Sequence, residues 1–155
     1  MRLLILSDCH GDKRSVAAAI EQQPTADTIL FLGDGIRDIE YLEETYPTKS
    51  FYKVSGNCDL ASLEPLTRLL EFGGKRVMMT HGHEYHVKFG GREAEYTARR
   101  NQCDLLLFGH THQPFTAYDD GLYMMNPGSV KRGNSHTYGV VDLVNGGILC
   151  NIVEL

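Results

Sequence analysis

The sequence predicts an α/β protein, an α+β sandwich in which two mixed β-sheets pack face to face and are flanked by helices. Two observations carry this prediction. Strand-like apolar runs alternate with helix-like segments in the first half, whereas strand pairs joined by glycine-containing turns dominate the second half. No linker, repeat or low-complexity stretch interrupts the 155 residues, so we expect a single domain spanning residues 1–155.

The first half is predicted to run strand, helix, strand, helix, strand. Apolar runs at Arg2–Ser7, Thr28–Leu32 and Phe51–Ser55 have the length and composition of buried strands. Between them, helices are expected from about Asp12 to Glu21, stopped by Pro24, and from Ile36 to Thr45, ended by Pro47. This alternation is typical of parallel strands joined by crossover helices.

The second half is predicted to contain mostly hairpins. Thr67–Phe72 and Lys75–Thr80 flank a Gly-Gly turn, a helix is expected near Gly91–Asn101, and a buried strand follows at about Asp104–Phe108. The remaining strand-like runs, joined in part by Asp-Gly and Asn-Gly turns, are Phe115–Tyr118, Leu122–Met125, Tyr138–Leu143 and Ile148–Glu154.

The composition is that of an ordinary globular protein, with 42% hydrophobic and 23% charged residues. No apolar run approaches the roughly 20 residues that a membrane helix needs, and the apolar start is too short for an export signal, so a cytoplasmic protein without a membrane partner is expected. The net charge of −5 argues against a surface that coats nucleic acid. The cysteines lack the paired spacing of a zinc site or a disulfide framework.

Polar clusters directly follow five of the predicted strands. They are Asp8-Cys9-His10, Gly33-Asp34, Gly56-Asn57-Cys58-Asp59, His81-Gly82-His83 and Gly109-His110-Thr111-His112. Because the carboxyl ends of parallel strands meet at one edge of a sheet, we expect these side chains to converge. A mixture of carboxylate and amide oxygens with imidazole nitrogens suits Mn²⁺, Fe, Zn²⁺ or Ni²⁺. The order of the clusters therefore predicts a two-metal hydrolase site.

Taken singly, each cluster also fits an ordinary structural role. Asp8 and His10, spaced two apart after a strand, are expected to point the same way with Cys9 turned elsewhere, but Asp8 also fits a helix cap. Asp34 fits a tight turn, and Asn57 fits an Asx-turn. The two histidines of Gly109-His110-Thr111-His112 are the hardest to explain by core packing. Only the combination of all five makes the purely structural explanation improbable.

The motifs D-x-H, G-D, G-N, H and G-H-x-H, in this order, resemble the calcineurin-like metallophosphoesterase superfamily. The short length, the Gly56–Asp59 cluster and the segment Met125–Ser129 are similar to its small prokaryotic YfcE-like phosphodiesterase branch. The resemblance implies an αββα fold with two divalent metal ions, manganese first, with nickel, zinc or iron as alternatives. It implies three ligands to a first ion, three to a second and one bridging carboxylate: Asp8, His10 and His112; Asn57, His81 and His110; and Asp34.

The activity implied is that of a metal-dependent phosphoesterase, most specifically a phosphodiesterase that hydrolyses small phosphodiesters with a hydroxide activated by the dinuclear centre. Asn57, Asp34 and His81 are expected to act on the reacting group, and Cys58, Asp59 and His83 to contact substrate or support the ligands. Many relatives carry histidine where Cys58 stands. Since a thiol is a poor general acid, we expect good leaving groups to be preferred.

Two other classes of function stay open at this point. The retromer scaffold subunit resembles the same fold but works through protein contacts with a degraded metal site, whereas all seven ligand positions are filled here. A nuclease is disfavoured by the acidic balance and by the lack of basic stripes. The expected partner is a small phosphate-ester substrate, and homo-oligomerisation is left open.

Overall fold

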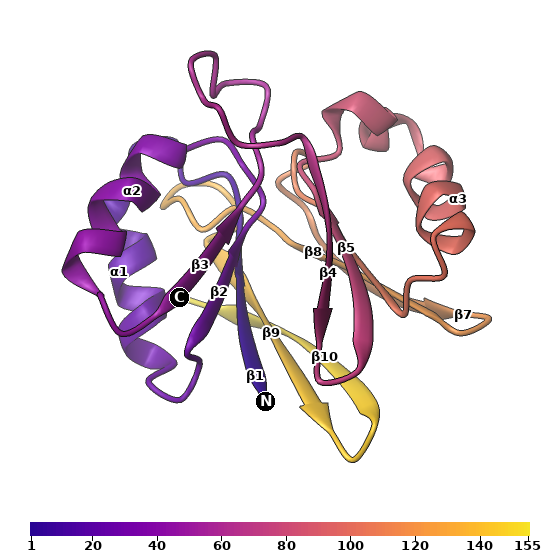
Figure 1. The fold of residues 1–155 in the computed structure, drawn as a ribbon. Coiled ribbons are helices and arrows are strands. Elements are labelled where there is room, and N and C mark those ends of the chain that lie inside the picture. The colour runs from indigo at the N-terminus through magenta and orange to yellow at the C-terminus, as the bar shows by residue number, and fades with distance from the viewer.

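Two five-stranded sheets pack against each other in the computed structural model, which describes residues 1–155 (Figure 1). The first sheet has the order β10 (Gly147–Glu154), β9 (Thr137–Val144), β1 (Arg2–Leu6), β2 (Thr28–Phe31), β3 (Ser50–Lys53). The second has the order β4 (Thr67–Phe72), β5 (Lys75–Thr80), β6 (Leu105–Leu107), β8 (Leu122–Pro127), β7 (Pro114–Asp119). Both sheets mix parallel and antiparallel pairs, which confirms the predicted fold class.

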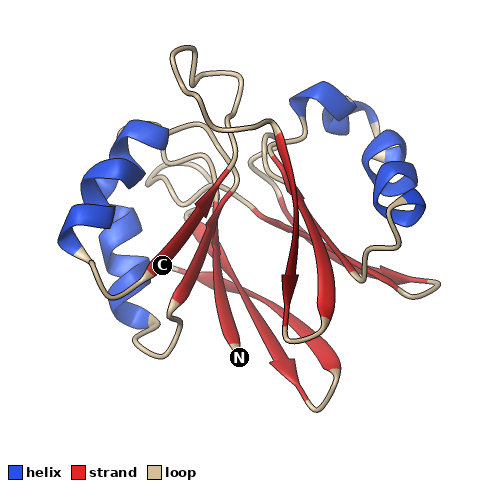
Figure 2. Ribbon diagram, viewed as in Figure 1, coloured by secondary structure: helices blue, strands red, loops and turns tan.

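Helices cover the outer faces of the sandwich (Figure 2). The helices α1 (Lys13–Gln22) and α2 (Ile36–Thr45) lie on the first sheet, and α3 (Arg92–Arg100) lies on the second. Two short 3-10 helices, η1 (His83–Tyr85) and η2 (Val87–Phe89), follow β5 and were not predicted. No helix combines the length and apolar character required to cross a bilayer.

Strand alternation explains why the layers form. Along β1, Leu3 and Ile5 point into the space between the sheets, whereas Leu4 and Leu6 point outward into the layer under α1 and α2. Successive side chains of a strand face opposite sides of its sheet, so a strand that is apolar throughout must be covered on both sides. All four of these leucine and isoleucine side chains are fully buried.

The parallel strands fix the place of the site. β1, β2 and β3 run parallel in the first sheet, and β5, β6 and β8 run parallel in the second. Their carboxyl ends meet at the upper edge of Figure 1, where the connecting loops of both sheets come together. Open α/β sheets place ligands at this kind of edge.

Candidate metal centre

All the polar clusters predicted from the sequence meet at this edge. The loops after β1 and β6 bring the Nε2 atoms of His10 and His112 within 3.3 Å of each other. The loops after β3, β5 and β6 bring the His81 Nε2 atom within 3.1 Å of both Asn57 Oδ1 and His110 Nδ1. Three groups of potential metal ligands result, each with its ligand atoms within 4.8 Å of one another. Asp8, His10 and His112 form what we call the first ligand set, and Asp34, His81 and His110 form the second. The third group, His10, Asp34 and Cys58, connects these two sets.

The backbone reaches these positions through tight turns. Positive φ angles occur at Asp8 (56°), His10 (42°), Asp34 (60°), His110 (67°) and His112 (59°). Side chains other than glycine seldom adopt this left-handed conformation, and such outliers cluster at functional sites. The expected extended alternation from Asp8 to His10 is therefore wrong for the backbone, although both side chains do reach the same place.

The first ligand set contains a buried carboxylate oxygen without a hydrogen-bond partner. Asp8 is fully buried, and its Oδ1 atom lies 3.1 Å from His112 Nε2 and 3.8 Å from His10 Nε2. Its other oxygen, Oδ2, accepts hydrogen bonds from the His110 N–H, at 3.1 Å, and from the Ser7 hydroxyl. An unpaired buried carboxylate oxygen is costly, and a cation coordinated by Asp8 and the two imidazoles would remove this cost.

The second ligand set is oriented by a carbonyl. Nδ1 of His81 lies 2.7 Å from the Leu32 carbonyl oxygen. Because a carbonyl can only accept, Nδ1 carries the proton and a neutral ring keeps its lone pair on Nε2, facing Asn57 and His110. A hydrogen bond from the second ring nitrogen to a backbone carbonyl is the usual support for a metal-binding histidine. Burial, together with His81 and Lys88, lowers the pKa of His110 to about 4, so the His110 ring is neutral at pH 7.

Asp34 lies between the two sets. Its Oδ2 atom is 3.5 Å from His81 Nε2 and 3.7 Å from His10 Nε2. Its Oδ1 atom accepts the N–H of Cys58 at 2.8 Å, which leaves Oδ2 facing both sets. Burial alone would raise the pKa of Asp34, but His81 and the Cys58 N–H outweigh it and lower the pKa. The carboxylate is therefore ionised, and its Oδ2 atom faces His10 on one side and His81 on the other.

The Asp59 carboxylate was expected to contact substrate or support a ligand side chain, but it binds main-chain N–H groups of two loops and contacts neither Asn57 nor a histidine. It accepts four main-chain N–H groups, at 2.7–3.0 Å, from Asp34, Gly35, Ile36 and Gly56. Three of these donors lie at the start of α2, where the helix dipole favours an anion. Asp59 thus joins the loop that carries Asn57 to the loop that carries Asp34.

The end of β8 and the segment after it support the centre through contacts that the sequence did not reveal. The buried Asn126 side chain donates to the Gly109 carbonyl at 2.9 Å and to the Thr111 hydroxyl at 3.0 Å. The Ser129 hydroxyl donates to the Asp8 carbonyl at 2.8 Å, and the Asn134 amide lies 3.3 Å from His112 Nδ1. The only available signal was a small polar run directly after a strand, the pattern shared by the predicted ligands.

Gly109 has a steric role. A Cβ atom at this position would overlap the Ser7 hydroxyl and lie 3.0 Å from Asp8 Oδ2. Glycine is therefore required for the loop after β6 to approach the loop after β1. This close approach brings His110 and His112 to Asp8.

Cys58 and His83 lie at the margins of the two sets. Cys58 is exposed, and desolvation together with the Asp34 carboxylate raises the pKa of its thiol to about 11. The His83 ring centroid is 5.4 Å from that of His81, and its Nδ1 atom has no partner. Burial and His81 lower the pKa of His83.

A polar cavity of about 520 Å³ opens beside the centre on the side of the first sheet. Its lining includes His10, Asp34 and Cys58 from the ligand groups, together with Arg37 and Asp38. The candidate ligands His10, Asp34 and Cys58 therefore face this cavity directly.

The αββα sandwich and the set of carboxylates, amide and imidazoles at its loop edge define a metallophosphoesterase. The profile of the calcineurin-like phosphoesterase superfamily domain matches residues 1–146, so the chain belongs to this superfamily. The phosphodiesterase YfcE of Escherichia coli (strain K12) is 33% identical over 172 aligned positions, which cover 92% of this chain and 88% of YfcE. The fold of this family implies divalent metal binding, and the ligand sets above fit it.

Solved structures show the same fold. A predicted phosphoesterase from Streptococcus pneumoniae TIGR4 superposes with a TM-score of 0.84 at 24% identity, covering 99% of this chain and 88% of that one. A single mutant of Vps29 from Entamoeba histolytica gives a TM-score of 0.75 at 22% identity, covering 100% of this chain and 99% of that one. At these identities the likeness concerns the fold alone.

Proposed function

We propose that this chain is a phosphodiesterase that cleaves small phosphodiesters with two divalent metal ions held in one catalytic domain. The observation that carries the proposal is the buried Asp8 Oδ1 atom, which has no hydrogen-bond partner and faces two imidazoles. Around it, all the ligand positions implied by the family pattern hold the expected residue types. The relation to the phosphodiesterase YfcE supports a diester substrate.

In this proposal each ion takes three ligands of its own and shares Asp34. Asp8, His10 and His112 hold one ion, and Asn57, His81 and His110 hold the other. Mixed oxygen and nitrogen ligands are compatible with Mn²⁺, Ni²⁺, Zn²⁺ and iron, and we place Mn²⁺ first because of the family resemblance. When bound, such a pair supplies Lewis-acid activation of water at neutral pH and neutralises charge on the phosphoryl group.

The protein groups position the reacting phosphate. The Leu32 carbonyl fixes the ring of His81, and the Cys58 N–H fixes the carboxylate of Asp34, so both enter the reaction already oriented. The Asn57 amide presents its oxygen to His81 and donates one N–H to Cys58 Sγ at 3.4 Å, which leaves its second N–H for an oxygen of the phosphate. Cys58 stands protonated at the polar cavity, where it is a weak donor to the leaving oxygen.

The test is hydrolysis of bis(p-nitrophenyl) phosphate beside p-nitrophenyl phosphate, after chelation and re-addition of Mn²⁺, Ni²⁺ or Zn²⁺. We expect diester cleavage that depends on metal and that His112→Ala abolishes. His86→Ala is the matched control, because His86 also has a positive φ (51°) but is exposed and outside the ligand sets. A folded protein without turnover under any metal would overturn the proposal and favour a Vps29-like role in protein contacts.

A further inference from the structure

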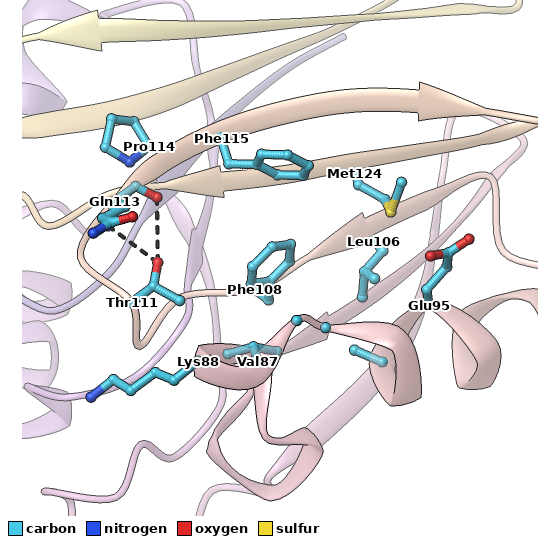
Figure 3. Close-up of a pocket in the computed structure, with 13 residues that line it drawn as sticks. Val87, Lys88, Glu95, Leu106, Phe108, Thr111, Gln113, Pro114, Phe115 and Met124 are labelled. Atoms are coloured by element: carbon cyan, nitrogen blue, oxygen red, sulfur yellow. Dashed lines mark hydrogen bonds between the residues drawn. The ribbon is translucent and has the colours of Figure 1, made fainter.

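A second cavity, of about 610 Å³, lies on the outer side of the second sheet (Figure 3). One wall is formed by Leu106 of β6, Phe108 directly after it, Met124 of β8 and Phe115 of β7, and Val87 of η2 lies opposite. We call this cavity the apolar groove. It exists because α3 packs over β6 and leaves the neighbouring surface of β8 and β7 uncovered. Its volume is within the range of about 300–1,000 Å³ that is usual for small-molecule sites.

One end of the apolar groove reaches the loop that carries His110 and His112. Thr111, which lines that end, lies in the chain between the ligands His110 and His112. The Asn126 amide holds the Thr111 hydroxyl, at 3.0 Å, in the same network that supports this loop. The Lys88 side chain extends toward the Thr111 end of the groove and away from Glu95 (Figure 3). A cation at this end suits a phosphate held at the neighbouring ligand sets.

The wall of the apolar groove is aromatic. The rings of Phe108 and Phe115 have their centroids 6.1 Å apart and their planes inclined by 50°. Phe115 is 45% exposed, so one face of this pair is available to a ligand. Offset and edge-to-face contacts with a third ring are favourable in this geometry.

The two cavities differ in character and lie on opposite sheets: ligand residues line the polar cavity, and the apolar groove ends at Thr111 in the ligand loop. The polar cavity beside Cys58 carries Arg37 and Asp38, whereas the apolar groove carries phenylalanine, leucine and methionine. A phosphodiester has two organic groups on one phosphorus atom. Two unlike cavities are therefore suited to two unlike ester groups.

We propose that the apolar groove binds an aromatic ester group of the phosphodiester substrate, while the phosphate occupies the metal centre. This inference rests on the proposed function and adds a substrate class to it: diesters with one flat, apolar group. The connection through Thr111 and the position of Lys88 favour a substrate group over a second copy of the chain.

Binding is tested by NMR on protein loaded with Zn²⁺, which is diamagnetic, and labelled with ¹³C in the methionine methyl groups. Met124 lines the apolar groove, and its neighbour Met125 is fully buried on the opposite face of β8. We expect phenylphosphonate to shift the Met124 signal and leave Met125 in place, and methylphosphonate to shift neither. A Met124 signal that does not respond to phenylphosphonate would overturn the inference.

Kinetics with two diesters of the same leaving group, phenyl p-nitrophenyl phosphate and methyl p-nitrophenyl phosphate, separate this inference from the proposed function. We expect Phe115→Ala to lower kcat/KM about five- to tenfold for the phenyl ester and less than about twofold for the methyl ester. Tyr118→Ala is the matched control, since Tyr118 is an exposed aromatic residue of β7 outside the groove.

The possible failures can be told apart. No metal-dependent cleavage of either ester by the unmodified protein would overturn the proposed function and this inference with it. Cleavage of both esters with a ratio that Phe115→Ala leaves unchanged would overturn the inference alone. A dimer that Phe115→Ala converts into a monomer, measured by analytical ultracentrifugation, would assign the groove to a second copy and overturn the inference as well.

Discussion

His81 donates a hydrogen bond from Nδ1 to the carbonyl oxygen of Leu32 over 2.7 Å, and this bond joins the two sheets at their loop edge. Leu32 directly follows β2, two residues before Asp34, whereas His81 directly follows β5. The bond therefore sets where the histidine of one sheet stands relative to the carboxylate of the other. Gly33 allows this approach, since a Cβ atom there would lie 2.6 Å from the Gly56 nitrogen and 3.0 Å from His81 Nδ1.

The buried Asp8 carboxylate predicts a stability response to metal. We expect a divalent ion, present at a hundred times its dissociation constant, to raise the free energy of unfolding by about 2.7 kcal/mol. Asp8→Asn removes the charge from the first ligand set and is expected to weaken this response while folding normally without metal, because it relieves an unpaired buried oxygen. Urea unfolding with and without Zn²⁺ measures both effects.

The control for this experiment is Asp27→Asn, because the Asp27 side chain is 83% exposed. It should keep the full stabilisation by Zn²⁺. An Asp8→Asn variant that Zn²⁺ stabilises as strongly as the unmodified protein would count against Asp8 as a ligand.

The four N–H groups around Asp59 predict that Asp59→Asn strongly lowers the free energy of unfolding, although the two side chains have nearly the same shape. Each carboxylate oxygen accepts two of them, so the amide of Asp59→Asn must face two N–H donors in either orientation. We expect a loss of about 2–4 kcal/mol in the free energy of unfolding, since hydrogen bonds to charged groups contribute about 1.5–3 kcal/mol each. Urea unfolding of metal-free protein is the measurement.

Asp120→Asn, in the exposed turn between β7 and β8, serves as the control for Asp59→Asn. Its unfolding free energy should change by less than about 0.5 kcal/mol. An Asp59→Asn variant as stable as this control would show that the four contacts do not hold the loops.

The cap of α1 predicts a pH-dependent contribution to stability. Asp12 accepts the Ser15 N–H at 3.1 Å and the Arg132 N–H at 3.0 Å, and these contacts lower its pKa below the ordinary 3.8 although burial acts in the other direction. A carboxylate with a lowered pKa stabilises the fold above pH 3.8 and loses this effect as the pH falls through the folded-state value. Asp12→Ala should therefore cost about 1–2 kcal/mol at pH 7 and less at pH 3.

This dependence is measured by urea unfolding of both proteins at several pH values between 3 and 7. The difference between them should shrink only below about pH 4, where the carboxylate takes up its proton. A difference that is constant over this range would mean that the charge of Asp12 contributes nothing.

Cys58 predicts a limit on the leaving groups that are accepted, provided that the proposed function holds. With its pKa raised to about 11, the thiol gives little general-acid help. We expect Cys58→His to raise kcat/KM for a diester with an alkyl leaving group by about a hundredfold, the lower end of general-acid effects, and to leave p-nitrophenyl esters nearly unchanged. Cys58→Ser is the control and should improve neither; equal rates for all three proteins on the alkyl ester would contradict the prediction.

The sequence predicted those features of the site that depend on neighbouring residues in the chain. Each ligand cluster directly follows an apolar run, so its place at a strand end could be predicted without knowledge of the tertiary structure. The order of the clusters then identified the family, and the family profile confirms it. The two mixed sheets followed from the same runs and turns.

The rest depends on contacts between distant segments. The Ser129 hydroxyl reaches the Asp8 carbonyl across 121 positions, and nothing near either residue signals that contact. The four donors around Asp59 are backbone groups, which are the same in every residue type except proline. The left-handed turns at Asp8 and His10 are imposed by the surrounding loops, since residues other than glycine disfavour them.

The ligand sets also affect how firmly the two sheets are held together. His10 and His112 are 102 positions apart in the chain and follow strands of different sheets, and each would hold the same ion. A bound ion would then act as a reversible cross-link between the sheets, one that forms only when the chain is folded and therefore favours the closed arrangement. Chelation of the ion would allow the two sheets to separate more easily at this edge. The rate of amide hydrogen exchange in the strands between which the core lies should therefore rise when the metal is removed.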